Sequence, residues 1–304
     1  MVTVERNDAV LVIAADQQLS MLSRFRYMIV STIERLIDLW RYRELIRNLV
    51  VRDLKVRYRN SVLGIFWSLF NPILMMMVFT LVFTVMTPHF KVPNFPVFVL
   101  CAILPWNFFL ASVNGSIRSI VDNSSLVNKV YFPREILPIS VVLANMVNFL
   151  IALIVLFAFI LLLQIPFTPW VLLLPLVIAV QVTFTIGFGL IMATANVFYR
   201  DTQVIMEVVM MAWFFVTPIF YSLSILPNNY EILGMSFDVA RWARILNPMA
   251  SIIENYRITL YGIGQGGAPP DIYFFMRTLV TSLLVLFIGA TIFYRHSRSF
   301  GEEV

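Results

Sequence analysis

The chain has 304 residues, of which 60% are hydrophobic and 13% are charged. Charged residues make up about a quarter of an ordinary soluble domain, so this composition excludes a soluble globular protein and indicates an integral membrane protein. The net charge of +5 is compatible with nucleic acid, but in so apolar a chain we expect the basic residues to face a membrane surface, and we expect no nucleic-acid partner.

The first 32 residues contain one short apolar patch, Val10–Ala15. This patch is too short for the apolar region of a signal peptide. We therefore predict that residues 1–32 form a retained cytoplasmic extension.

Residues 33–60 combine apolar residues at helical spacing with many basic residues. The basic residues of this stretch include Arg52, Lys55, Arg57 and Arg59. The pattern predicts an amphipathic interface helix at the inner membrane surface, with its basic side chains toward lipid phosphates. A solvated basic helix packed on other protein is the alternative.

Residues 61–304 have the pattern of one transmembrane domain. About 20 helical residues cross the roughly 30 Å hydrocarbon core of a bilayer. Stretches of this kind lie at approximately 62–86, 97–117, 137–163, 170–197, 203–223 and 272–294. The sequence therefore predicts an all-α integral membrane protein with six transmembrane helices.

The basic residues indicate how these six helices are oriented. Of the 22 Lys and Arg residues, 11 precede the first stretch, and six more follow the second, fourth or sixth stretch. Basic residues gather in the cytoplasmic loops of membrane proteins. Both termini and the connections after the second and fourth stretches are therefore predicted to be cytoplasmic.

The connection between the fifth and sixth stretches is too apolar for a plain loop. An apolar face recurs at helical spacing after Asn247-Pro248, which supplies an N-cap residue followed by proline at the first helical position. The residues from Asp238 to Leu246 form a second amphipathic pattern before this break. We predict two short outer helices that dip into the outer leaflet or cover a pore mouth, and a passive interfacial hairpin is the alternative.

The sequence contains no recognisable catalytic site. Gly262–Gly267 matches G-x-G-x-x-G, but the strand before it and the helix after it that a nucleotide-binding turn needs are not predicted. The chain contains no phosphate-binding G-x-x-x-x-G-K-[ST] motif, and His89 and His296 fall on opposite predicted faces. We therefore expect no catalytic residue, no metal site and no cofactor in this chain.

Ionisable residues inside the predicted spans are few, with Glu207 and Arg277 as the candidates. Both lie near the end of a span, where a long side chain can reach the interface. A proton-coupled carrier is therefore poorly supported.

Aromatic residues are frequent in the spans. Trp67, Phe70, Trp106 and Trp213 are predicted to line a channel, because aromatic rings can stack on sugar faces along a conduit. Aromatic belts and lipid-facing rings are the alternative interpretation.

The predicted cytoplasmic connection after the second span holds the sequence NKVYFPREILP. It places the aromatic residues Tyr131 and Phe132 beside charged residues and between prolines, which lower the entropy cost of holding one shape. This pattern favours docking to a soluble partner, with an ordinary interfacial loop as the alternative.

Three ordered motifs carry a resemblance to a known family. They are Arg43-Glu44-Leu45-Ile46 with Arg52-Asp53-Leu54-Lys55-Val56-Arg57-Tyr58, then Asn128-Lys129-Val130-Tyr131-Phe132-Pro133-Arg134-Glu135, and finally Asn247-Pro248. With six predicted spans, this order resembles the permease subunit of ABC-2 type exporters of lipid-linked polysaccharides, which include the O-antigen, capsule and teichoic-acid exporters.

The resemblance implies one half of a homodimeric channel in the cytoplasmic (inner) membrane, with two copies of a separate ABC ATPase subunit that hold ATP and Mg²⁺. Its cargo would be an undecaprenyl-type lipid-linked polysaccharide. The stretch Asn128–Pro138 would be a coupling helix, with Asn128, Lys129, Tyr131, Phe132, Pro133, Arg134 and Glu135 contacting the ATPase.

Two further sites follow from the same resemblance. Arg52, Lys55, Arg57 and Arg59 would form the cytoplasmic entrance for the lipid carrier, and Trp242, Asn247, Pro248 and Tyr256 would belong to an outer gate. The alternatives are an ABC-2 exporter of a drug or small lipid and a membrane-embedded glycosyl- or acyltransferase.

Overall fold

The computed structural model describes residues 40–59, 66–86, 92–130, 132–223, 230–232, 235–262 and 271–303. The chain divides into two compact units, Met1–Leu45 and Ile46–Val304. In the first unit, residues 40–45 are described, and the guanidinium carbon of Arg43 lies 5.9 Å from the centre of the Trp40 ring. The predicted extension 1–32, and residues 33–39 and 60 of the predicted interface helix, lie outside the described residues.

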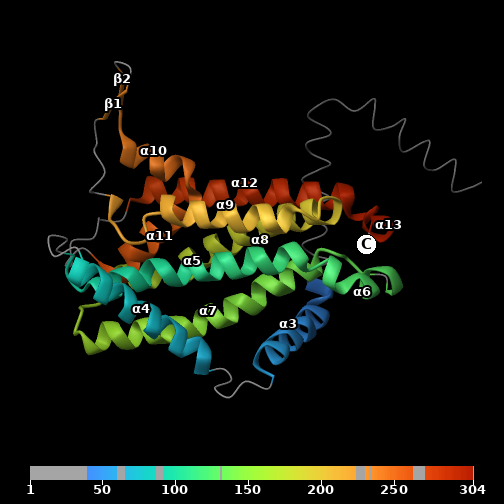
Figure 1. The fold of residues 1–304 in the computed structure, drawn as a ribbon, viewed down its shortest axis with the longest axis horizontal. Helices are drawn as coiled ribbons and strands as arrows, with labels where there is room; N and C mark the ends of the chain where they lie inside the picture. The colour runs from blue at the N-terminus through green and yellow to red at the C-terminus, as the bar shows by residue number, and fades with distance from the viewer. Residues whose placement is uncertain are drawn as a thin grey trace, which may run out of the picture. The chain divides into compact units, whose positions relative to one another are not determined.

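Long helices form most of the second unit. They are α3 (Arg43–Tyr58, which begins in the first unit), α4 (Phe66–Met86), α5 (Phe95–Arg118), α7 (Ile136–Leu162), α8 (Leu174–Phe198), α9 (Thr202–Val216) and α12 (Ile272–Ser297). Figure 1 shows α5 in the middle of this unit, with α4 and α7 on one side and α9 and α12 on the other. In agreement with this view, α5 contacts α4, α7, α8 and α9.

Short elements connect these helices. They are η1 (Val121–Asn123), α6 (Ser124–Lys129), η2 (Pro169–Leu173), β1 (Tyr230–Ile232), β2 (Met235–Phe237), α10 (Val239–Leu246), α11 (Pro248–Tyr256), the π-helical turn η4 (Arg257–Tyr261) and α13 (Phe300–Glu303). The antiparallel pair β1 and β2, with Glu231 opposite Ser236, is a small addition to the predicted all-α fold.

The prediction of a helical integral membrane protein is confirmed. Four helical segments are long and apolar enough to cross a bilayer: Phe95–Arg118, Ile136–Leu162, Pro169–Phe198 and Ile272–Ser297. The two remaining predicted spans contain shorter apolar helices, Phe70–Val82 and Thr202–Val216. The number of six spanning helices stays a prediction.

Proline explains why the fifth predicted span is shorter than expected. The sequence pattern extends to residue 223, but α9 ends at Val216 and Thr217 adopts an extended conformation. Thr217 precedes Pro218, and the residue before a proline is pushed away from the helical region. Pro72 and Pro105, by contrast, lie inside α4 and α5.

Glycine allows α8 and α12 to approach closely. A Cβ atom built on Gly289 would lie 2.1 Å from the carbonyl oxygen of Gly187, and one built on Gly187 would lie 2.5 Å from the backbone of Leu286. Small residues let helix backbones pack together in membranes. This pair therefore fixes α12 against α8.

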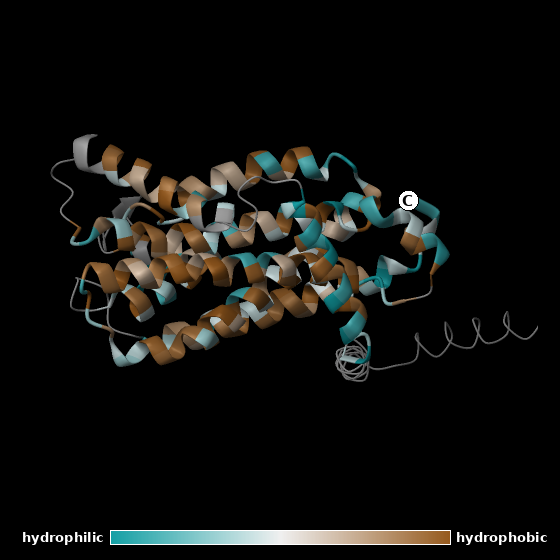
Figure 2. Cartoon of the chain, turned by 90° about the horizontal axis from the view of Figure 1, so that it is seen from below, coloured by the Kyte–Doolittle hydropathy of each residue, from teal (hydrophilic) through white to brown (hydrophobic). Residues whose placement is uncertain are grey.

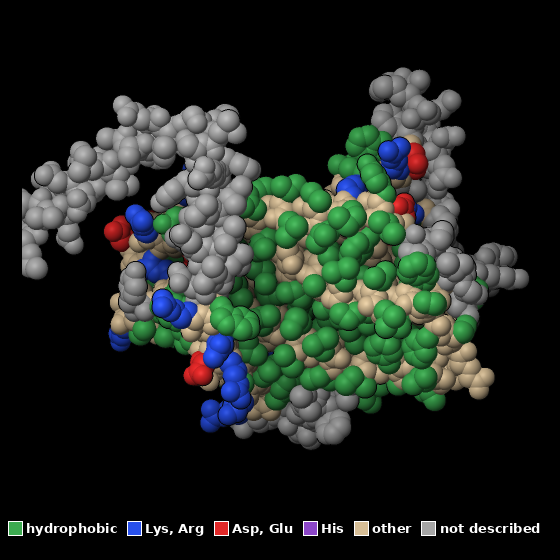
Figure 3. Space-filling model, turned by 180° about the vertical axis from the view of Figure 1, so that it is seen from behind, with side chains coloured by type: hydrophobic (Ala, Val, Ile, Leu, Met, Phe, Trp, Pro, Cys, Tyr) green, Lys and Arg blue, Asp and Glu red, His purple; other side chains and the backbone are tan. Residues whose placement is uncertain are grey.

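Polar residues gather at one end of the second unit. Figure 2 shows an apolar helical bundle whose more hydrophilic end holds α3, α6 and α13. In Figure 3 charged side chains lie toward the ends of the unit, on either side of a broad apolar face. This distribution is the one expected of a bundle whose middle lies in the bilayer.

Candidate functional site

The connection between α6 and α7 holds the residues predicted to contact an ATPase. Asn128 and Lys129 end α6, Val130 is extended, and Ile136 begins α7. The predicted single helix over Asn128–Pro138 is therefore wrong. The residue before Pro133 is disfavoured in a helix, whereas Pro138 is tolerated in the first turn of α7.

The exposure of this connection fits a docking surface. Asn128, Lys129 and Val130 are exposed, and Phe132 is half-buried. Tyr131 lies outside the described residues. The partner-binding roles of these residues stay predictions.

Arg134 ties the α6–α7 connection to the C-terminal part of the chain. Its Nη1 donates a hydrogen bond to the carbonyl oxygen of Ser297. A Cβ atom built on Gly301 would lie 3.4 Å from both Arg134 Nη2 and Asn128 Oδ1. Phe300 is fully buried, and its ring centre lies 5.1 Å from that of Phe293. The C-terminal helix α13 therefore packs against the α6–α7 connection.

The predicted entrance residues lie on α3 and directly after it. Arg52 donates a hydrogen bond of 3.1 Å to Asn123 Oδ1, and its Nη2 lies 3.0 Å from the carboxylate of Asp53. Lys55, Arg57 and Arg59 are exposed. Among the described residues these three have no carboxylate partner, so their charges are available to an anion.

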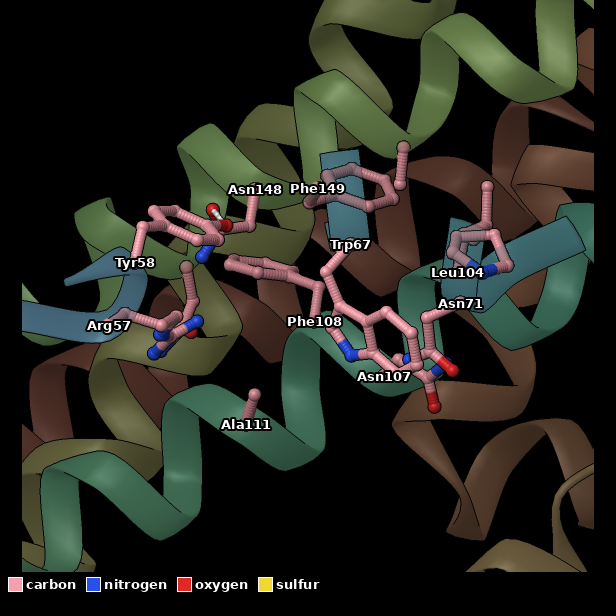
Figure 4. Close-up of a pocket in the computed structure, with 13 residues that line it drawn as sticks. Arg57, Tyr58, Trp67, Asn71, Leu104, Asn107, Phe108, Ala111, Asn148 and Phe149 are labelled. Atoms are coloured by element: carbon pink, nitrogen blue, oxygen red, sulfur yellow. Dashed lines mark hydrogen bonds between the residues drawn. The ribbon is translucent and has the colours of Figure 1, made fainter. Parts of the chain in front are cut away.

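A cavity of about 260 Å³, lined by both polar and apolar side chains, lies between the end of α3 and helices α4, α5 and α7. Its lining residues are Arg57, Tyr58, Trp67, Asn71, Pro72, Leu104, Asn107, Phe108, Ala111, Asn145, Asn148, Phe149 and Ala152. Figure 4 shows Arg57, Tyr58 and Asn148 toward one end of the cavity and Trp67, Asn71 and Asn107 toward the other. Four asparagines around one space are unusual in so apolar a chain.

Two of these asparagines have buried polar atoms without a partner. Asn145 Nδ2 donates to the carbonyl oxygen of Val141 at 3.0 Å, and Asn148 Oδ1 accepts from the Tyr58 hydroxyl at 2.6 Å. Asn145 Oδ1 and Asn148 Nδ2 have no hydrogen-bond partner. Buried polar groups are nearly always hydrogen-bonded in folded proteins, so these two atoms are suited to hydrogen-bond a ligand in the cavity.

The predicted channel aromatics form two separate pairs. Trp67 and Phe70 have ring centres 6.3 Å apart and are both about half exposed. Trp106 and Trp213 have ring centres 6.4 Å apart, and Trp106 is 1% exposed within the bundle. In this subunit the first pair is placed to face a ligand, while the second pair belongs to the core. The channel-lining role of all four stays a prediction.

Two short helices flank the predicted break at Asn247-Pro248: α10 ends at Leu246 and α11 begins at Pro248. Their outer location and gate role stay predictions. Asn247 Oδ1 accepts from the backbone N–H of Ala250 at 3.2 Å, and Pro248 is the first residue of α11. Trp213 Nε1 donates to the same Oδ1 at 2.8 Å, and Asn247 Nδ2 donates to Thr217 Oγ1 at 3.0 Å. Asn247 therefore joins the end of α9 to the start of α11.

Helix α11 is buried on all sides. The sequence pattern did not predict this burial. Every residue from Met249 to Tyr256 is buried. Trp242, on α10, is 47% exposed. Of the predicted gate residues, Asn247 and Tyr256 are thus inside the bundle, and Trp242 is at its surface.

Arg257, directly after α11, forms a buried ion pair with Glu254 of α11. The sequence did not predict this pair, because its segment was assigned to the outer interface. Arg257 Nη1 lies 3.9 Å from Glu254 Oε2, and Arg257 Nη2 donates to the carbonyl oxygen of Ile219 at 2.7 Å. Its guanidinium carbon lies 3.7 Å from the centre of the Phe98 ring. Burial lowers the pKa of Arg257 to about 10, against the opposing effect of Glu254, so the side chain stays charged at neutral pH.

The two ionisable residues predicted inside the spans have different surroundings. Glu207 is exposed and accepts a long hydrogen bond of 3.4 Å from Gln203. Arg277 donates to the carbonyl oxygen of Arg244 at 2.5 Å and to Ser251 Oγ at 3.1 Å. Arg277 therefore holds α12 to the α10–α11 junction.

Within the described residues, no group of three or more His, Cys, Asp or Glu side chains could hold a metal ion. Of the G-x-G-x-x-G stretch, Gly262 is described, with φ at 75°. The remaining residues of the stretch lie outside the described residues.

Comparison with known proteins identifies a family and close relatives. The family model of the ABC-2 type transporter membrane protein matches residues 44–261. The O-antigen export system permease protein RfbA of Myxococcus xanthus is 36% identical over 271 residues, which cover 88% of this chain and 98% of the relative. RfbA of Klebsiella pneumoniae is 32% identical over 254 residues, covering 83% and 91% of the two chains. The polysialic acid transport protein KpsM of Escherichia coli is 26% identical over 259 residues, covering 81% and 90%.

Proposed function

The chain belongs to the ABC-2 type transporter family, and from this premise we propose that it is the permease subunit of an ATP-driven exporter. The exporter moves a lipid-linked, O-antigen-like polysaccharide across the cytoplasmic membrane. The observation that carries this proposal is the similarity to an O-antigen export permease over 98% of that relative's length.

Energy for transport comes from a separate subunit in this proposal. The sequence has no G-x-x-x-x-G-K-[ST] motif to hold ATP phosphates. ATP and Mg²⁺ are therefore assigned to an ABC ATPase, of which two copies bind a homodimer of this chain.

The surface proposed for the ATPase is the α6–α7 connection. It lies at the hydrophilic end of the second unit, which Figure 2 shows near the C-terminus, and the positive-inside tendency makes this end cytoplasmic. Its exposed Lys129 and Val130, and the aromatic Phe132, provide charge and apolar area for a small interface. Arg134 and α13 hold the connection in place so that motion of the ATPase is passed to α7 and α12.

The outer end of the proposed export path lies near α10 and α11. Asn247 connects α9 to α11, and Arg277 connects α12 to the α10–α11 junction. A change in the angle between α9 and α12 would therefore move both short helices. This coupling supports the proposed outer gate of Trp242, Asn247, Pro248 and Tyr256.

The experiment that tests the proposal is purification of the tagged chain from its own cells, followed by identification of co-purified proteins and an ATPase assay. We expect an ABC ATPase in equal amount, and loss of surface polysaccharide when the gene is deleted. Accumulation of a drug or small lipid in the deletion strain, with normal surface polysaccharide, would replace the polysaccharide with that cargo. Absence of any ATPase would contradict the transporter.

A further inference from the structure

We propose that the cavity between α3, α4, α5 and α7 binds a glycosyl phosphate, a sugar joined to phosphate, within a single subunit. The identification of its source as the head group of a lipid-linked glycan rests on the proposed function. The proposal that the cavity binds a ligand of this kind rests on the chemistry of its lining.

Two asparagines of α7 offer one hydrogen-bond acceptor and one donor. Asn145 is 3% exposed, and its Nδ2 bonds to Val141 while its Oδ1 has no partner. Asn148 Oδ1 accepts from Tyr58, while Asn148 Nδ2 has no partner. A hydroxyl group both donates and accepts, so a sugar hydroxyl can satisfy both asparagines.

The remaining lining adds a cation, further amides and an aromatic ring. Arg57 has no carboxylate partner among the described residues, and a guanidinium binds phosphate oxygens through two parallel N–H groups. The amides of Asn71 and Asn107 make no hydrogen bond within the described part of the chain and are free for a ligand. Trp67, half exposed at the other end of the cavity from Arg57 in Figure 4, offers a ring face to a sugar.

The size of the cavity suits a head group rather than a polymer. A volume of about 260 Å³ holds a monosaccharide but lies below the range of roughly 300–1,000 Å³ that is typical of sites for larger ligands. Helices α5 and α7 are both long enough to cross the membrane. A ligand attached to a lipid can therefore reach the cavity without leaving the bilayer.

An acyl chain of an ordinary lipid fits this lining poorly. It would leave the asparagine amides without partners, and an unsatisfied buried polar group costs stability. A phospholipid head group such as phosphatidylglycerol shares hydroxyl and phosphate with a glycosyl phosphate, and the test below distinguishes the two.

The test uses the full chain in phosphatidylcholine nanodiscs and native mass spectrometry to measure binding of a short-chain polyprenyl diphosphate N-acetylglucosamine. We expect one probe per subunit, and about tenfold weaker binding in Asn145→Leu and in Asn148→Leu. The melting temperature of Asn145→Leu should stay equal or rise, since the substitution removes an unpaired buried atom. Arg57→Gln, at an exposed position, should weaken binding as well.

A matched control is Asn196→Leu. Asn196 is also buried on a membrane helix, but its Nδ2 donates to the carbonyl oxygen of Ile117 at 2.9 Å, and it does not line the cavity. This variant should melt at a lower temperature and bind the probe within about twofold of the wild type. A lower melting temperature with unchanged binding in Asn145→Leu and Asn148→Leu would overturn the proposal, because it would show a purely structural role.

Two additional probes decide the ligand class. Equal binding of phosphatidylglycerol, with the same dependence on Asn145, would overturn the proposal that the cavity recognises a sugar. Equal binding of the polyprenyl diphosphate without sugar would do the same. Surface polysaccharide in the gene-deletion strain tests the proposed function separately. If deletion removes the polysaccharide while the cavity variants bind the probe normally, the cavity proposal alone fails.

Discussion

The hydroxyl group of Tyr256 donates a hydrogen bond of 2.6 Å to the side-chain oxygen of Gln181, and both side chains are fully buried. Gln181 in turn donates through Nε2 to the carbonyl oxygen of Pro105 at 2.7 Å. These two hydrogen bonds join α11 to α8 and α8 to α5. Tyr256 and Gln181 are 75 residues apart in the sequence. It fixes the inserted helix α11 to the centre of the bundle.

Replacement of Tyr256 by phenylalanine should destabilise the protein by about 1–2 kcal/mol, because Gln181 Oε1 loses its partner in a buried site. Thermal unfolding in detergent measures the effect. The control is Tyr273→Phe, at an exposed position on α12, which should leave the melting temperature unchanged. Equal melting of Tyr256→Phe and wild type would show that water replaces the lost bond.

Replacement of Arg257 by methionine should be more damaging, at about 3–5 kcal/mol, because Glu254 remains buried without its partner charge. The same variant removes the hydrogen bonds to the carbonyl oxygens of Ile219 and Tyr221. The double variant Arg257→Met/Glu254→Gln should recover part of the loss. Unfolding of all three proteins in one detergent measures the recovery, and a double variant less stable than the single one would contradict the pairing.

The interior of α11 shows what local sequence could and could not predict. Asn247 and Pro248 are adjacent, so their cap and first helical turn followed from the sequence alone. The carbonyl groups that accept from Arg257 and the side chain that accepts from Tyr256 lie 36 to 75 positions away in the sequence, and no local pattern encodes such contacts. The buried position of α11 was missed for the same reason.

Other differences have equally physical causes. The positions of the long helices followed from apolar length, whereas α9 ends early because Pro218 follows it. Trp106 was grouped with Trp67 by residue type, yet one is buried and the other is half exposed. The cavity asparagines come from three helices, and amides scattered through apolar helices give no periodic signal.

Truncation of Phe132 to alanine should weaken binding of the ATPase about 30-fold or more, because aromatic anchors contribute roughly 2 kcal/mol or more at small interfaces. Co-purification of the ATPase with the tagged chain measures the loss, while membrane insertion should be unchanged. Phe167→Ala is the control, since Phe167 is an exposed phenylalanine in the predicted outer connection between α7 and η2. Retention of the ATPase by Phe132→Ala would move the docking surface elsewhere.

Replacement of Arg134 by alanine should loosen the α6–α7 connection from the C-terminal end of α12, because the hydrogen bond to the Ser297 carbonyl oxygen is lost. A hydrogen bond from a charged donor contributes about 1.5–3 kcal/mol. We expect faster hydrogen exchange in residues 124–135 and weaker ATPase binding. Arg200→Ala, at an exposed position that is predicted to be cytoplasmic, should change neither. Unchanged exchange in Arg134→Ala would argue against this support from the end of α12.

The contact of Gly187 with Gly289 predicts strict size limits at both positions. Alanine at Gly289 would place a methyl carbon 2.1 Å from the carbonyl oxygen of Gly187, so α8 and α12 must separate. Overpacking of this kind costs about 1–3 kcal/mol, and thermal unfolding should show it. Alanine at Gly301 is the control, since its Cβ would approach no atom closer than 3.4 Å.

Because α12 holds the α10–α11 junction through Arg277, Gly289→Ala should also expose a cysteine placed at Ser251 to a membrane-impermeant thiol reagent. Unchanged labelling would mean that the outer helices keep their place when α8 and α12 move apart.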